Sequence, residues 1–156
     1  MKVYEEKIPM LNYVIAIMTI SAIIILIILI SQFTSKAIPV GVVLRVLLVI
    51  IFLFNLVVLI SFRRLTITVI GDILSFGFGR FRAEVNLKDI IAVEIEDYVF
   101  SKYYGYGIRM GRDGTLGYVP KGGQGLRIAI RGNKRAYFFI TDHAPELKNI
   151  LEKYLR

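Results

Sequence analysis

Three acidic side chains cluster near the middle of the chain, at Glu94, Glu96 and Asp97. On an extended strand, Glu94 and Glu96 lie on one face about 7 Å apart, and two carboxylates at that spacing can hold a cation or act as an acid–base pair. A solvated face, or pairing with arginines of a neighbouring strand, is the more ordinary role of such residues. We therefore expect neither a catalytic group nor a metal site at this cluster.

Other residues that could support catalysis are scarce in the sequence. The chain has no cysteine, which excludes disulfides and thiolate chemistry, and its single His143 disfavours a Ser-His-Asp arrangement. The glycines of Gly105-x-Gly107-x-x-x-Gly111 are one residue too far apart for a dinucleotide-binding loop, and residues 122–125 lack the Lys-Ser/Thr ending of a P-loop. We predict a protein that is not an enzyme and binds no cofactor.

Cationic side chains are the most informative chemical feature. From residue 63 to residue 156, sixteen Lys and Arg stand against ten Asp and Glu, so this part carries +6 of the chain's formal +8. Near a leaflet rich in anionic lipid, each Lys or Arg contributes about 1 kcal/mol of attraction. Nucleic acid is disfavoured, because acidic residues are interspersed with the basic ones. The candidate residues for binding anionic lipid or a protein partner are Arg63, Arg64, Arg80, Arg82, Lys102, Arg109, Arg112, Lys121, Arg127, Arg131 and Arg135.

Four tyrosines accompany these cations, at Tyr103, Tyr104, Tyr106 and Tyr118. Amphipathic aromatic rings settle at the boundary between lipid and water, so these residues are candidates for contact with the membrane surface. Packing at the mouth of a β domain is an equally good explanation. Both alternatives stay open, as does a generic attraction to the membrane without headgroup selectivity.

The elements that position these side chains begin with two apolar runs, at about 8–30 and 39–62. The chain is 56 % hydrophobic, and between Pro9 and Phe62 its only charged residues are two cations. A helix of about 23 residues spans about 34 Å, enough to cross a hydrocarbon core of about 30 Å. Proline lies near both starts, where its missing N–H is harmless. A cleaved signal peptide is disfavoured, because the leading segment carries two glutamates and no small-residue cleavage site follows the run.

The basic residues that flank the runs predict their orientation. The side of the two termini carries Lys2, Lys7, Arg63 and Arg64. The opposite side offers Lys36, in the connection between the runs, and Arg45, about two turns inside the second run. The positive-inside rule then predicts a multi-pass protein of the plasma membrane with both termini in the cytoplasm. Residues 1–62 would be the anchor and residues 63–156 a cytoplasmic domain.

Asn55 is the strongly polar residue deep in the second run. Asparagine can form hydrogen bonds between membrane helices, so it could join the two spans or two copies of the chain. A local bond, or a bond to water, is equally compatible with the sequence.

The period of the pattern changes to two from residue 65 onward. Residues 65–69 and 74–78 alternate apolar and polar side chains around a turn at Gly71-Asp72, which predicts a β-hairpin. Further strands are predicted at 83–87 and 91–99. The Gly- and Tyr-rich residues 100–125 predict short strand pieces joined by loops.

The last predicted hairpin joins residues 126–131 to residues 135–141. A three-residue loop, Gly132-Asn133-Lys134, places Leu126 opposite Ile140 and gathers the apolar side chains on one face. The opposite face then carries Arg127, Arg131, Arg135 and Tyr137.

A helix at about 143–155 is predicted to close the chain. Asp142 is the expected N-cap, and Pro145 lies in the first turn. An apolar stripe that includes Leu147 and Leu151 repeats at helical spacing, so we expect this helix to pack on the sheet.

The chain resembles small bacterial and archaeal membrane proteins that carry a pleckstrin-homology-like (PH-like) domain after a two-helix membrane hairpin. The resemblance lies in residues 104–109 (Tyr-Gly-Tyr-Gly-Ile-Arg), in the strand pair 125–140, and in Thr141 followed by Pro145-Glu146-Leu147. It implies an α+β, mainly β domain, namely a seven-stranded barrel capped by a C-terminal helix. At residues 118–123 the sequence departs from the Ser-Gly pair that is usual in this family.

These observations predict a non-enzymatic interaction or scaffold module anchored at the inner face of a prokaryotic plasma membrane. Its expected partners are membrane lipids and a membrane or cytoplasmic protein, and it could also form homo-oligomers. The alternative is a subunit of a small oligomeric channel or transporter with the β domains as a collar. Against it, neither span shows a polar face suited to lining a pore.

Overall fold

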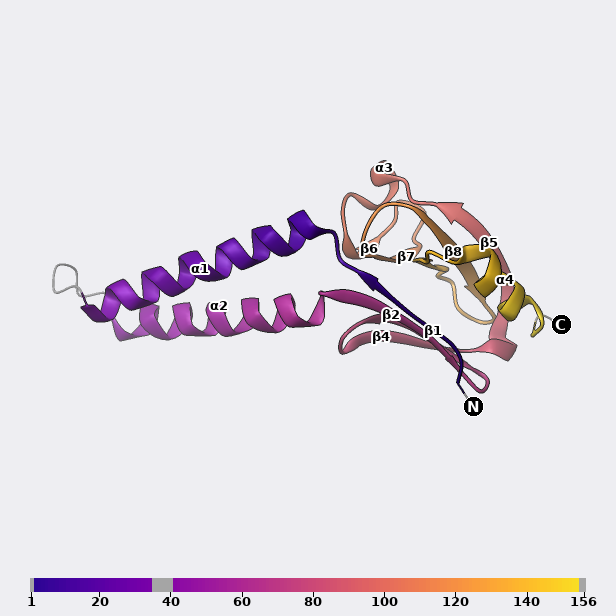
Figure 1. The fold of residues 1–156 in the computed structure, drawn as a ribbon, viewed down its shortest axis with the longest axis horizontal. Helices are drawn as coiled ribbons and strands as arrows, with labels where there is room; N and C mark the ends of the chain where they lie inside the picture. The colour runs from indigo at the N-terminus through magenta and orange to yellow at the C-terminus, as the bar shows by residue number, and fades with distance from the viewer. Residues whose placement is uncertain (1, 35–40, 155–156) are drawn as a thin grey trace.

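The computed structural model describes residues 2–34 and 41–154. Two long helices, α1 (Asn12–Thr34) and α2 (Val42–Ser61), lie side by side and project from a β domain at the other end of the molecule (Figure 1). Both helices are long and apolar enough to cross a membrane. A pair of apolar helices joined to a β-rich domain confirms the coarse fold class predicted from the sequence.

The first helix begins later than predicted. Residues that were expected to open the span form instead a strand, β1 (Lys2–Pro9), and α1 starts at Asn12. Pro9 therefore ends a strand and does not occupy the first turn of a helix. The second helix starts at Val42, close to the predicted boundary, and Pro39 lies outside the described residues.

The first sheet is antiparallel, and its strands neighbour each other in chain order. It consists of β1, β2 (Arg64–Ile70), β3 (Ile73–Phe78) and β4 (Phe81–Asn86). The predicted hairpin between β2 and β3 is confirmed, with Ile70 opposite Ile73 around the turn. Its apolar face is also confirmed, because alternate residues from Leu65 to Val69 and from Leu74 to Phe78 are fully buried.

The second sheet has the order β5-β8-β9-β7-β6, in which β7 and β9 are parallel and the other neighbours antiparallel. Its strands are β5 (Ile90–Asp97), β8 (Gln124–Ile130), β9 (Tyr137–Ile140), β7 (Leu116–Val119) and β6 (Gly107–Met110). A short 3-10 helix, η1 (Leu87–Asp89), links the two sheets. The described residues thus contain nine strands, two more than the seven predicted.

The two sheets pack face to face around one apolar core. Phe76 of β3 lies at its centre, fully buried, with its ring centroid 4.5 Å from that of Phe139 and 5.2 Å from that of Tyr118. The C-terminal helix α4 (Ala144–Glu152) packs on β5 and β8 and buries Leu147 and Leu151, as its stripe predicts.

The predicted register of the last hairpin is wrong by one residue. Leu126 lies opposite Phe139, and Arg127 opposite Phe138. The prediction assumed that one face of this hairpin is solvated, but both faces are covered: Phe138 is fully buried and stacks on Tyr103, with ring centroids 5.2 Å apart. Gly125 makes room for that ring, since a Cβ there would lie 2.9 Å from it.

This register removes the predicted arginine face. Strands β8 and β9 are joined by residues 131–136, not by a three-residue loop, so Arg131 and Arg135 lie in the connection. Tyr137 points into the core, where its ring centroid is 5.6 Å from that of Phe76.

Strand β1 joins the two ends of the chain. Glu6 accepts hydrogen bonds from the hydroxyls of Tyr4 (2.7 Å) and Thr141 (2.6 Å), and from the backbone N–H of Asp142 (2.7 Å). The predicted N-cap is therefore wrong: His143 precedes the first helical residue, and the Asp142 carboxylate pairs with Lys121 instead.

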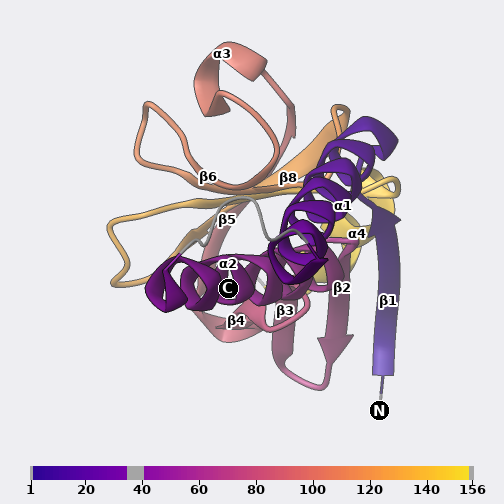
Figure 2. The same cartoon turned by 90° about the vertical axis from the view of Figure 1, so that its left-hand side faces the viewer.

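The pairing of β1 with β2 also constrains the helices. Strand β1 precedes α1 and strand β2 follows α2, yet the two strands pair from Tyr4 opposite Val69 to Pro9 opposite Arg64. The start of α1 and the end of α2 therefore lie at the same end of the helix pair, beside the sheets (Figure 1). Figure 2 shows β1 next to β2 at the edge of the first sheet. Two helices arranged in this way form a hairpin.

Candidate functional site

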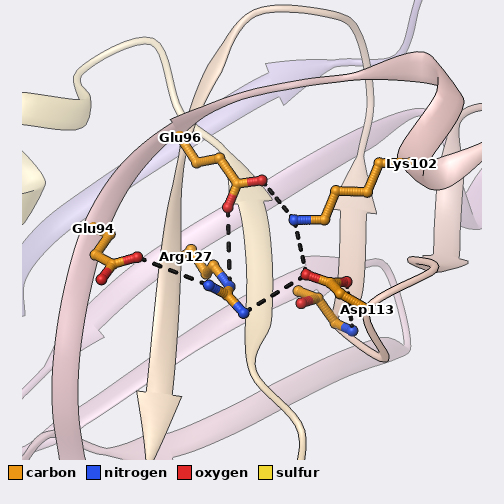
Figure 3. Close-up of polar contacts among 6 residues, drawn as sticks. Glu94, Glu96, Lys102, Asp113 and Arg127 are labelled. Carbon is orange, nitrogen blue, oxygen red and sulfur yellow. Dashed lines mark hydrogen bonds and ion pairs between the residues drawn. The ribbon is translucent and has the colours of Figure 1, made fainter.

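Five charged side chains form a network on the outer face of the second sheet (Figure 3). Lys102 is central: its Nζ lies 2.6 Å from Glu96 Oε1 and 2.9 Å from Asp113 Oδ2. Arg127 approaches the same two carboxylates and Glu94 at 3.6–3.9 Å. Lys102 comes from a short helix, α3 (Phe100–Tyr103), so the network links that helix to the sheet.

The network covers the part of the apolar core that lies on the outer side of the second sheet. Tyr103, at the end of α3, is buried against Gly117, where a Cβ would lie 2.8 Å from its ring. Burial raises the pKa of Tyr103 to about 12, so this phenol stays protonated and neutral at physiological pH. The packing explains why β7 carries glycine at this position, and why the Gly- and Tyr-rich segment folds over the sheet.

These contacts give the acidic cluster a structural role. Glu94 and Glu96 share a face, as predicted, and both pair with Arg127 of the neighbouring strand. In the part of the chain that the structure describes, no three His, Asp or Glu side chains are grouped to hold a metal ion. Lys102 and Arg127 are engaged with carboxylates, which makes them poor candidates for binding a partner.

The network makes the stability of the folded protein depend on pH in the acidic range. Burial opposes ionisation of Asp113, but hydrogen bonds from Lys102 and from the Thr115 backbone N–H outweigh it and lower the Asp113 pKa from 3.8 to about 2. Because the folded-state pKa is lowered, this stabilisation is present above about pH 4 and is lost as the pH falls towards 2.

We therefore expect Asp113→Asn to destabilise the protein by about 1 kcal/mol at pH 7, a modest value because the side chain is one third exposed. The difference from wild type should shrink between pH 4 and pH 2, as measured by urea unfolding of the full chain in detergent. Asp97→Asn is the matched control, since its exposed carboxylate lies outside the network. Parallel pH profiles for Asp113→Asn and wild type would contradict the assignment.

A second group of candidate cations surrounds the end of α2. Arg63 and Arg64 follow the helix directly, and the Arg63 carbonyl accepts a hydrogen bond from the Met10 N–H (2.9 Å). The β3–β4 turn is close by, because a Cβ on Gly79 would lie 3.0 Å from the Ser61 Cα. We call five cations at this end the basic collar: Arg63, Arg64, Arg80, Arg82 and Arg109.

The collar arginines have no anionic partner within the described residues, in contrast to Lys102 and Arg127. Arg82 and Arg109 are oriented by hydrogen bonds from Nε to the carbonyls of Gly79 (2.9 Å) and Tyr106 (2.8 Å). Their remaining N–H groups are available for an anion outside the protein.

The other candidate cations differ from the collar in their partners or in their position. Lys121 is at the same end but pairs with Asp142 at 2.8 Å, and Arg112 lies 4.9 Å from the centroid of the Tyr104 ring. Arg131 is at the opposite end of the sheets, where its backbone N–H donates to the backbone carbonyl of Asp89, and Arg135 follows it in the same connection. The sequence grouped these residues with the collar, whereas the structure separates them.

Two of the four tyrosines are buried and two are not. Tyr103 and Tyr118 pack in the core of the domain. Tyr104 is exposed beside Arg112. Tyr106 lies at the junction with the helices, with its ring centroid 5.9 Å from that of Tyr13 in α1.

Asn55 contacts the other helix. Its Nδ2 donates a 2.9 Å hydrogen bond to the Ser21 hydroxyl of α1. Of the alternatives left open by the sequence, this geometry corresponds to a bond between the two spans.

An apolar crevice, which the sequence did not indicate, lies where the helices meet the β domain. Its volume is about 280 Å³. It is bordered by residues that are far apart in the chain, among them Val14, Met18, Val58, Phe62, Ile108 and Arg109. No periodicity or motif connects these positions, so only the folded arrangement reveals them.

No protein-family model matches the chain, and neither a curated protein nor a solved structure matches it.

Proposed function

We propose that the protein is a non-enzymatic interaction module that holds a basic β domain against the cytoplasmic face of a prokaryotic plasma membrane. The observation that carries this proposal is the pairing of β1 with β2. Because these strands flank the two apolar helices, both helices can cross the membrane only as a hairpin whose termini share one side.

The contacts between helices and domain support a fixed orientation. Phe62, directly after α2, stacks on Phe78 of the core with ring centroids 5.0 Å apart. Leu11, directly before α1, donates its N–H to the Pro120 carbonyl (2.9 Å). A domain attached through both helices in this way does not swing on a linker but presents the same end to the bilayer.

The charges at that end support attraction to anionic lipid. The basic collar surrounds the end of α2, at the level where lipid headgroups would lie if the helix crosses the membrane. The positive-inside rule then favours the cytoplasmic side for the collar and for both termini. A protein partner that the domain recruits to this surface, and homo-oligomers formed through the exposed helix faces, belong to the same proposal.

A PH-like domain is part of the proposal. Two packed sheets closed by a C-terminal helix support it, whereas nine strands and the parallel β7–β9 pair depart from the seven-stranded pattern. The channel alternative finds no comparable support: the hydroxyls of Thr19, Ser21 and Ser31 bond to carbonyls of their own helix.

Cysteine labelling tests the anchoring, because the chain has no cysteine of its own. In separate variants, Val3→Cys and Lys134→Cys should react with a membrane-impermeant maleimide only after spheroplasts are permeabilised. Lys36→Cys, in the connection between the spans, should react in intact spheroplasts. Labelling of Val3→Cys and Lys134→Cys from opposite sides would contradict the hairpin.

Crosslinking in native membranes tests the interaction. The double variant Arg80→Gln/Arg82→Gln removes two collar charges, each worth about 1 kcal/mol beside an anionic leaflet, and should lower recovery of crosslinked lipid or partner several-fold. Arg131→Gln/Arg135→Gln removes the same charge from the opposite end and should leave recovery unchanged. Equal recovery from the two variants would argue against the collar.

A further inference from the structure

The residues that border the apolar crevice lie at the depths where the acyl chain and the headgroup of a lipid would lie. Met18 lies six residues into α1, about 9 Å from its start, and Val58 lies three residues, about 5 Å, before the end of α2. If the helices cross a membrane, the part of the crevice at these two residues lies within the hydrocarbon. The part at Arg109 on β6, which we call its mouth, then lies at the level of the headgroups.

The mouth carries a positioned cation. Arg109 donates from Nε to the Tyr106 carbonyl at 2.8 Å, and its guanidinium lies against Gly105, where a Cβ would be 3.6 Å from Nε and from one terminal nitrogen. This leaves terminal N–H groups that can bind two oxygens of one phosphate, the geometry that guanidinium favours.

The walls of the crevice suit an acyl chain. They are formed mainly by Val, Met, Phe and Ile side chains, which an apolar hydrocarbon chain can contact without leaving a polar group unpaired. A volume of about 280 Å³ holds part of one acyl chain, not a whole lipid, so the rest of the chain would continue along the lipid-facing surfaces of α1 and α2.

We propose that this crevice binds an anionic phospholipid, with the phosphate on Arg109 and one acyl chain between the domain-side ends of α1 and α2. The inference rests on the proposed insertion of the helices in a membrane, and goes beyond it by assigning one lipid to one site. The collar attracts the anionic leaflet as a whole, whereas the crevice selects and orients a single molecule.

Native mass spectrometry of the full-length protein tests this site. The protein is reconstituted in nanodiscs of phosphatidylcholine with one tenth phosphatidylglycerol and released under conditions that strip loosely bound lipid. In wild type, the ratio of retained phosphatidylglycerol to retained phosphatidylcholine should be about ten times their ratio in the bilayer. Arg109→Gln should abolish this enrichment, because it removes the charge that binds the phosphate.

Matched variants separate the site from general electrostatics and from misfolding. Arg112→Gln removes the same charge from a residue that does not border the crevice, and should retain the lipid. Val58→Phe fills the crevice and should lose it, whereas Val57→Phe, at a neighbouring residue that is 53 % exposed, should not. Near-UV circular dichroism of the tyrosines should be the same in all variants.

Several results would overturn the proposal. One is retention of phosphatidylcholine and phosphatidylglycerol in the same proportion as in the bilayer. Another is equal retention of phosphatidylglycerol by Arg109→Gln and wild type. A third is displacement of the lipid by glycerol 3-phosphate, which has the phosphate without the acyl chains. A protein that enters nanodiscs normally but shows no enrichment refutes the lipid site alone. A protein that stays outside the nanodiscs refutes the anchoring as well.

Discussion

Replacing Phe76 with alanine is expected to lower the free energy of unfolding of the β domain by about 3–5 kcal/mol, the usual cost of removing a fully buried phenylalanine ring. Phe76 is completely buried on the first sheet, and its ring contacts Phe139, Tyr118 and Tyr137 of the second sheet. Removing the ring therefore opens a cavity at the centre of the interface between the two sheets.

Urea unfolding of the full chain in mild detergent, followed by near-UV circular dichroism of tyrosine, measures this loss. Phe100→Ala is the matched control, because Phe100 is 58 % exposed and its truncation should change stability by less than about 0.5 kcal/mol. A loss no larger than that of the control would mean that the sheets do not share the core described here.

The parts of the fold that could be predicted are those in which apolar side chains follow one simple pattern along the segment. Apolar side chains occupy every second position from Leu65 to Val69 in β2 and from Leu74 to Phe78 in β3, and the two helices are predominantly apolar. In these segments, local sequence and tertiary burial require the same side-chain pattern, so the pattern alone identifies the element.

The parts of the fold that could not be predicted are segments whose side chains contact two different parts of the protein. In β8 and β9, both faces are covered, one by the first sheet and one by Tyr103, so the rule of a single apolar face gives the wrong register. In β1, Glu6 interrupts the apolar alternation because its carboxylate bonds to Thr141, far away in the sequence. Neither partner is visible from the segment itself.

The same distinction applies to the candidate site. Arg63 and Arg64 are predictable members of the collar, because they follow an apolar helix and must lie at its end. Arg80 and Arg109 join them only through the packing of the β3–β4 turn and of β6 against the helix ends. Lys102 and Arg127 have the same residue types as the collar but neighbours of opposite charge, and charge counting cannot distinguish the two situations.

Strand β1 attaches the β domain to the two helices, and the buried side chain of Ile8 holds β1 against β2. Ile8 is completely buried opposite Leu65, at the point where the first sheet approaches the helices. An aspartate at this position would place an unpaired carboxylate in the core, a change that exceeds about 4 kcal/mol in cost. Protonation of the carboxylate would remove only part of this cost, because the neutral acid would still be buried without a hydrogen-bond partner, whereas detachment of the strand from β2 exposes the group to water.

We therefore expect Ile8→Asp to expose the edge of β2 while both helices remain in the membrane. Hydrogen exchange of the full chain in nanodiscs should show lost protection at the β2 amides that bond to β1, together with a loss of more than about 4 kcal/mol in urea unfolding. Val3→Asp introduces the same charge on the same strand at a residue that is 50 % exposed, and should leave both measurements close to wild type. If Ile8→Asp keeps the β2 amides protected, β1 does not hold the domain to the helix hairpin. The fixed orientation on which the proposed function depends would then have to come from the contacts of Leu11 and Phe62 with the domain.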